Sequence, residues 1–157
     1  MKIQIYLILL LCFCGSTSYS QKIEMIDYFS RISCDEYLAR MQFAMLSADK
    51  NPNGKIYFLM YEGPTLVWAG KFPKTKMANP VVGSFQAKVR SMKRLILLNK
   101  RAVSDFVFVN AGFRNEPTVE VWLVPKGAEP PKSTPTVEKM KLRNGKAKGF
   151  CTDCCGP

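Results

Sequence analysis

The sequence contains no histidine in its 157 residues. Without an imidazole there is no Ser-His or Cys-His nucleophile pair and no histidine-containing metal site. Acidic residues are few, because 12 Asp and Glu stand against 23 Lys and Arg, and the formal net charge at pH 7 is +11. The apolar run at residues 3–14 is shorter than the roughly 20 residues of a transmembrane helix. These absences exclude the commonest catalytic pairs and favour an anionic partner.

The first twenty residues have the pattern of a secretory signal peptide. Lys2 precedes the apolar run, and small and polar residues follow at 15–20. Ser18 and Ser20 fit the small-residue positions before a cut at Gln21. We therefore expect residues 1–20 to be removed and the mature protein to be exported, either to the periplasm or outside the cell, with no transmembrane segment.

The rest of the chain divides by composition. Residues 21–124 alternate between periodic apolar segments and turn signals, and they are numerous enough to bury the core of one domain. Residues 125–157 hold Pro125, Pro130, Pro131 and Pro135 among Lys, Ser and Thr. This composition predicts an extended proline-rich linker without a core, followed by a basic tail that contains cysteines.

Two amphipathic helices are expected in the domain. The first follows Ser33, which forms a capping box with Glu36, and it ends at the turn of residues 51–54. The second begins at Ser84, which we expect to cap it. Its apolar stripe consists of Phe85, Val89, Met92 and Ile96. Its basic residues are Arg90, Lys93, Arg94, Lys100 and Arg101.

Four main strands are expected around these helices. The first covers residues 23–29, and residues 56–61 and 106–110 are apolar on both faces, as in buried parallel strands. Residues 118–124 alternate between apolar and polar and predict a half-exposed last strand. We expect residues 111–117 to form a hairpin loop between the last two strands.

The segment between the second strand and the second helix has weaker signals. Residues 66–69 have the composition of a short extra strand. Residues 70–80 are basic and rich in turn formers, and we expect a loop there.

The resulting order β-α-β-α-β-β, with buried parallel strands and a closing hairpin, resembles the OmpA-like domain family over residues 23–124. The resemblance implies an α+β fold, a two-layer sandwich of helices on a sheet. It also implies peptidoglycan binding, because OmpA-like domains hold the peptidoglycan peptide with an Asp after the second strand and an Arg on the following helix. Here residues 62–65 read Glu-Gly-Pro-Thr, and the helix offers Lys88 and Arg90.

A second resemblance is to a set of uncharacterised exported bacterial proteins. They have patterns similar to residues 32–36, 110–114 and 118–125 of this chain. This resemblance implies no particular activity.

Basic side chains are the candidate ligand contacts. They are Lys88, Arg90, Arg94 and Arg114. Clustered guanidinium groups can clamp carboxylates or phosphates with two hydrogen bonds, whereas the alternative for a helix is an ordinary solvated face. Arg114 is included because exposed loop residues often carry function.

Four cysteines follow the signal peptide. They are Cys34, Cys151, Cys154 and Cys155. An even number in an exported chain predicts disulfides, and we expect Cys34 to bond one of the three tail cysteines and pin the tail to the domain. The alternatives are a zinc site of four thiolates and a reactive Cys34 thiolate at a helix N-terminus. Because no histidine is present to act as a base, we assign no catalytic residue. Because an exported location favours oxidation of the cysteines, we assign no metal ligand.

These features predict an exported, non-enzymatic binding domain whose partner is an anionic cell-envelope polymer such as peptidoglycan. The alternative is a structural or accessory protein that engages an envelope protein through its tail, and a minority alternative is a thiol-dependent enzyme that uses Cys34. The basic charge also fits a simple role in solubility. We expect no cofactor, no metal and no nucleic-acid partner.

Overall fold

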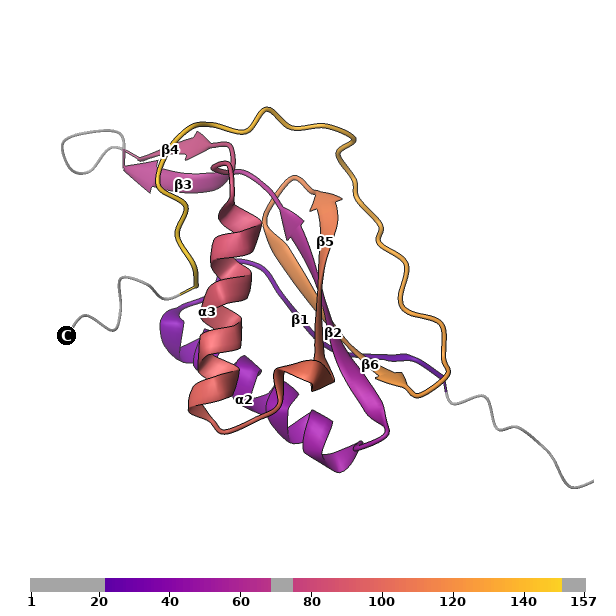
Figure 1. Ribbon diagram of the computed structural model, residues 1–157. Coiled ribbons are helices and arrows are strands. Elements are labelled where there is room, and N and C mark those ends of the chain that lie inside the picture. Colours follow the sequence, from indigo (N-terminus) through magenta and orange to yellow (C-terminus); the bar gives the residue numbers. More distant parts are fainter. Residues whose placement is uncertain (1–21, 69–74, 151–157) are drawn as a thin grey trace, which may run out of the picture.

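The computed structural model describes residues 22–68 and 75–150, and the predicted signal peptide and the three tail cysteines lie outside these residues. The chain forms a mixed α+β fold in which two helices lie on one face of a sheet (Figure 1). Its elements are β1 (Glu24–Phe29), α2 (Cys34–Lys50), β2 (Gly54–Glu62), β3 (Thr65–Trp68), β4 (Thr75–Ala78), α3 (Ser84–Leu98), the 3-10 turn η2 (Val103–Asp105), β5 (Phe106–Phe113) and β6 (Thr118–Pro125).

The main sheet has the strand order β1-β6-β2-β5. Strand β2 pairs with β5 in parallel and with β6 in antiparallel, and β1 is antiparallel to β6. The predicted order of helices and strands and the parallel pairing of the two apolar strands are therefore confirmed. Strand β2 lies inside the sheet, which explains why its residues are apolar on both faces.

The predicted closing hairpin is wrong, because β6 pairs with β1 and β2 and not with β5. The connection crosses the carboxyl end of β2, where the Arg114 amide donates to the Glu62 carbonyl at 2.9 Å. A Cβ on Gly63 would lie 2.3 Å from the backbone carbon of Glu116, so only glycine permits this crossing. The turn residues of this loop predict that the chain reverses direction. They do not predict which strands β6 pairs with.

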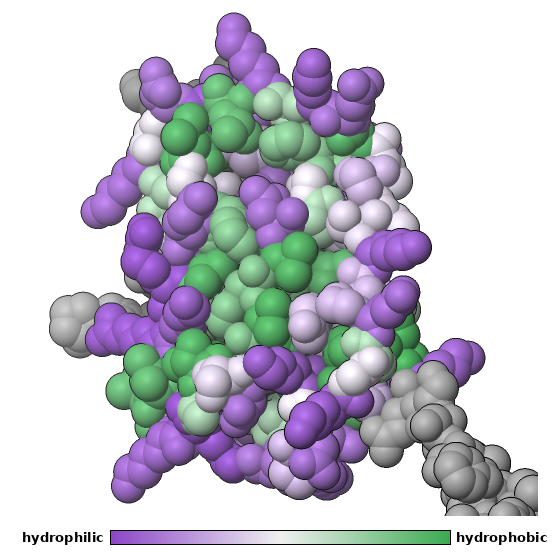
Figure 2. Space-filling model, turned by 45° about the vertical axis from the view of Figure 1, so that its right-hand side comes forward, coloured by the Kyte–Doolittle hydropathy of each residue, from purple (hydrophilic) through white to green (hydrophobic). Residues whose placement is uncertain are grey.

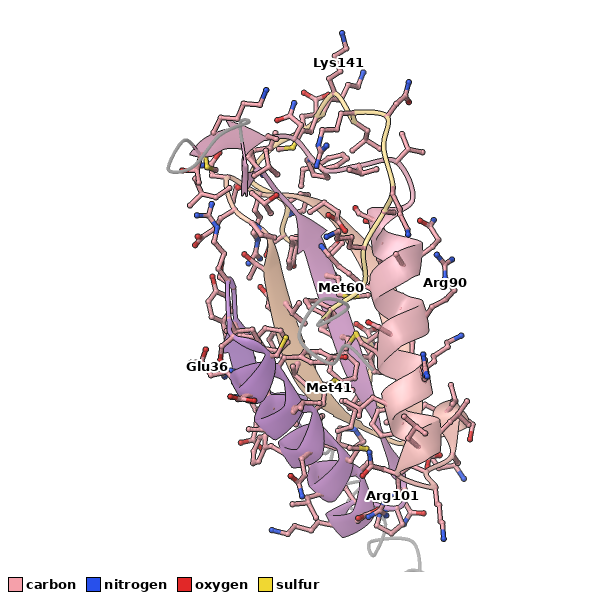
Figure 3. The ribbon with its side chains drawn as sticks, turned by 90° about the vertical axis from the view of Figure 1, so that its left-hand side faces the viewer. Glu36, Met41, Met60, Arg90, Arg101 and Lys141 are labelled. Atoms are coloured by element: carbon pink, nitrogen blue, oxygen red, sulfur yellow. The ribbon has the colours of Figure 1, made fainter. Side chains whose placement is uncertain are left out.

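The main core lies between the helices and the sheet. Met41 of α2 and Met60 of β2 belong to this buried layer (Figure 3). It also contains Met92 and Ile96 of α3, and both are completely buried. The stripe predicted for the second helix therefore faces the core, with Phe85 and Val89 at its partly buried margin.

The two helices begin in different ways. Ser33 is the N-cap of α2, its hydroxyl accepts from the Glu36 amide at 3.2 Å, and the Glu36 carboxylate accepts from the Ser33 amide at 2.9 Å. This confirms the predicted capping box, and the hydrogen bonds from the Ser33 backbone and then its hydroxyl lower the pKa of Glu36. Helix α3 is capped by Gly83 at φ +81° and not by the predicted Ser84. The left-handed backbone that turns into α3 favours glycine there.

The segment before α3 contains more strand than expected. Residues 65–68 form β3, as predicted in outline, but residues 75–78 form β4 instead of part of a loop. The two strands pair antiparallel, with Leu66 opposite Met77. Strand β3 lies outside the main sheet, and β4 supplies the backbone partners that it needs.

The predicted half-exposed last strand is also wrong. The polar residues Thr118 and Glu120 of β6 are only 2% and 8% exposed. They are buried because β6 lies between two strands and because the chain after β6 returns over the face of the sheet that carries no helix.

Residues 126–150, named the strap here, run around the domain as extended chain (Figure 1). The amide of Thr134 donates to the Tyr61 hydroxyl at 3.0 Å on the helix-free face. The amides of Thr136 and Val137 then donate to the Phe113 carbonyl at the end of β5. The predicted linker is thus extended, as expected, but it is hydrogen-bonded to the domain.

The second half of the strap returns along the helices. Arg143 exchanges backbone hydrogen bonds with the segment before α3, donating to Pro80 and accepting from Val82, both at 3.0 Å. The Phe150 amide donates to the Ser91 hydroxyl at 3.0 Å. The Phe150 ring stacks on Tyr37 with centroids 4.8 Å apart. The strap therefore adds an aromatic residue that contacts both α2 and α3.

Gly149 is the position that tests this docking. A Cβ there would lie 2.8 Å from the Ser91 Cβ and 2.9 Å from the Ala87 carbonyl oxygen, so Gly149→Ala forces the end of the strap away from α3. We predict several-fold faster trypsin cleavage after Lys146, because proteolysis follows the population of the open strap. Timed digestion with mass spectrometry measures it. The control Glu138→Ala, at an exposed strap position, leaves the rate unchanged, and equal rates in all three proteins would contradict the docking.

Candidate functional site

A cavity of about 500 Å³ lies at the carboxyl end of β2, beside the start of α3. In open sheets with parallel strands, ligands bind beyond the carboxyl ends of those strands, and β2 and β5 are the parallel pair here. The walls come from five parts of the chain: the end of β2, strand β3, residues 79–81 before α3, the first turns of α3 and the strap. The polar and charged lining residues are Glu62, Thr65, Asn79, Ser84, Lys88, Arg143, Lys146 and Lys148.

An ion pair lies at this cavity. The Lys88 Nζ of α3 is 3.0 Å from both carboxylate oxygens of Glu62. The two side chains are 18% and 7% exposed. The Lys88 Nζ also lies 5.8 Å from the centroid of the Phe150 ring, so the strap covers the pair from one side. A carboxylate so little exposed to water depends on its cationic partner.

The other charged groups that line the cavity are cations of the strap. Arg143, Lys146 and Lys148 are exposed residues, and the Arg143 Nε donates to the Asn79 carbonyl at 2.9 Å. Helix α3 begins beside them with no acidic residue in its first turn and no side-chain cap. Because the N-terminal end of a helix is its positive end, the dipole of α3 adds to the strap cations. With Glu62 neutralised by Lys88, the charged side chains that line the cavity among the described residues carry a net positive charge.

The structure separates the four residues that the sequence proposed as ligand contacts. Lys88 lines the cavity, whereas Arg90 and Arg94 are exposed residues of α3 that do not line it. Figure 3 shows Arg90 directed away from the sheet. These two arginines fit the alternative of a solvated helix face.

Arg114 belongs to an internal cluster on the helix-free face. Its Nη2 lies 2.6 Å from a carboxylate oxygen of Glu120 and 2.8 Å from the Thr134 hydroxyl. Its guanidinium carbon is 3.5 Å from the centroid of the Tyr61 ring. Trp122 donates to the same Glu120 carboxylate at 3.2 Å. Arg114 therefore joins β6, β2 and the strap, and its Nε and Nη2 donate hydrogen bonds inside the protein.

The sequence interpretation missed Arg143, Lys146 and Lys148 because it assigned them to a tail outside the domain. A signal was present, since five cations lie within residues 139–148 without an acidic residue among them. Such a run indicates an interaction segment, but only its hydrogen bonds to residues 79–82 place it at the cavity.

The described residues contain no group of three or more His, Cys, Asp or Glu side chains that could hold a metal ion. In the same residues, neither α2 nor α3 is long and apolar enough to cross a membrane. Comparison with protein-family models, with curated protein sequences and with solved structures finds no match to this chain.

Removal of the Lys88 charge tests the buried ion pair. We predict that Lys88→Met lowers the free energy of unfolding by about 3 kcal/mol, because it leaves the Glu62 carboxylate buried without a partner. The double variant Glu62→Gln with Lys88→Met recovers part of this loss. The control Arg90→Met, at an exposed site of the same helix, changes the free energy of unfolding by less than about 0.5 kcal/mol. Urea unfolding measures all three. A double variant less stable than Lys88→Met would contradict this interpretation.

The position of Phe150 supports a disulfide between Cys34 and the C-terminal tail. Cys34 is the first residue of α2, and Phe150 stacks on Tyr37 in the next turn. We propose that Cys34 bonds Cys151, Cys154 or Cys155, the three cysteines that follow Phe150 in the sequence. Peptide mapping of the exported protein without reduction is expected to give a Cys34 peptide joined to the C-terminal peptide. A Cys34 linked only to a second molecule would contradict this pairing.

Proposed function

We propose that this chain is an exported, non-enzymatic domain of the cell envelope that binds an anionic polymer, with peptidoglycan as the best candidate, at the cavity of Glu62 and Lys88. The observation that carries the proposal is the charge of this cavity. Its one carboxylate is neutralised by Lys88, and Arg143, Lys146 and Lys148 lie around it. A ligand that presents carboxylates would find hydrogen-bond donors from the strap.

The arrangement of the domain also supports an OmpA-like architecture. The main elements follow the order β-α-β-α-β-β, and the helices form one layer on the sheet. The OmpA-like resemblance implies an Asp after the second strand and an Arg on the following helix. This chain has Glu62 at the end of β2 and Lys88 on α3 instead, and these two elements supply a carboxylate and a cation to one cavity.

The strap favours this proposal over the alternative of a free tail that engages a partner protein. Its backbone is bonded to β2, β5, the segment before α3, and α3 itself. A segment with these contacts forms a wall of the cavity. Its hydrogen bonds to the domain fix the position of its cations at the cavity.

Binding to purified peptidoglycan tests the proposal. We predict that the protein sediments with the polymer at low salt and is released as salt screens the charges. Lys146→Gln with Lys148→Gln should weaken binding by about fivefold, since each exposed charge contact contributes about 0.5 kcal/mol. Lys50→Gln with Lys126→Gln has the same net charge and changes exposed lysines outside the cavity, so it should bind like the unchanged protein.

Two outcomes would contradict the proposal. The first is an absence of sedimentation at low salt. The second is an equal loss in the two double variants, which would mean that net charge alone draws the protein to the polymer.

A further inference from the structure

Strand β5 is an edge strand of the main sheet. Its one partner strand is β2, and among the described residues its other side carries only a single antiparallel bridge, from Phe113 to Val137 of the strap. This bridge lies at the carboxyl end of β5, so within the described part of the chain no second strand pairs with residues 106–112 on this side. An open edge of this kind is a template for a further strand, and the strap bridge shows that it accepts backbone partners.

A groove of about 430 Å³ runs beside this edge, between β5 and α3. Apolar side chains from both elements line it, with Phe85 and Val89 on the helix and Phe106 and Phe108 on the strand. Figure 2 shows hydrophobic residues gathered in the middle of one face of the molecule, with hydrophilic residues around them. An extended peptide on the β5 edge would place alternate side chains in this groove.

The charges at the groove select the kind of peptide. Among the described residues, the charged side chains that line the groove are Lys55 and Lys93, and none is acidic. The Lys93 Nζ lies 5.8 Å from the centroid of the Phe108 ring, directly beside the edge strand. The nearby acid, Asp105, is an exposed residue of η2 outside the lining. A second copy of this chain would bring its own lysines and a formal net charge of +11 to the same place.

We propose that the edge of β5 binds an extended segment of another protein by strand addition, and that the face this segment turns toward α3 carries apolar residues and one acidic residue. Its backbone pairs with residues 106–112, the apolar side chains of this face enter the groove, and the carboxylate on the same face contacts Lys93. This surface is separate from the cavity of Glu62 and Lys88, so the two proposals stand or fall independently.

The test uses the full mature chain and three synthetic octapeptides. The first has Thr at its odd positions and Val, Glu, Val and Val at its even positions, the second has Lys in place of that Glu, and the third is a scrambled form of the first. The expected result is binding of the first peptide alone, with slower amide exchange confined to residues 106–112. Lys93→Glu should weaken this binding by about fivefold, whereas Arg94→Glu, the same charge change on an exposed neighbour outside the groove, should leave it within twofold.

Four results would overturn the proposal. Equal weakening by the two variants, or binding of the scrambled peptide, would show attraction by charge without strand pairing. Peptide-induced protection outside β5 would place the site elsewhere. Concentration-dependent protection of β5 without any peptide would show that a second copy of this chain is the occupant.

Discussion

Strand β2 buries side chains on both of its faces, while the helices cover only one face of the sheet. The helix-free face holds Leu59 and Tyr61, both almost completely buried, and a second cover is therefore required. The strap supplies part of it with a backbone amide and a hydroxyl from Thr134. Because the Tyr61 hydroxyl and the Glu120 carboxylate are buried there, they need hydrogen-bond partners, and the strap and Arg114 provide them.

The same strap connects the helix-free face to the candidate site. After Thr134 it passes the end of β5, bonds the segment before α3 through Arg143, and ends with Phe150 against α2. This path places a run of cations at the cavity. The rest of the domain contributes the ion pair of Glu62 and Lys88 to the cavity lining. The charge of the cavity is thus a consequence of how the second face of the sheet is covered. Within the described residues, the strap bridges the edge of β5 at Phe113 and does not pair with the rest of that edge.

Local patterns predicted the features that local physics determines. The capping box of Ser33 and Glu36 and the burial of both faces of β2 were predicted correctly, because each follows from residues that are neighbours in the sequence. Strand β5, also apolar on both faces, is an edge strand and only partly buried. The pairing of β6 was not predictable in this way, since it depends on a crossing over Gly63 that brings together residues far apart in sequence. The docking of the strap on the domain was not predicted for a related reason. Its contacts come from single residues that do not recur at a regular spacing in the sequence. Of the four residues proposed as ligand contacts, only Lys88 lines the cavity. The fold determines where a cationic side chain lies, and the charge alone does not predict it.

Native-state hydrogen exchange of the strap amides tests most directly whether this segment is an integral layer of the fold. The amides of Thr134, Val137, Arg143 and Phe150 each donate to a group of the domain. The structure predicts that these four exchange far more slowly than the same residues in an unstructured peptide, as protected amides of a folded unit do. Exchange of all four at the rate of an unstructured peptide, while the amides of β2 remain protected, would contradict the account.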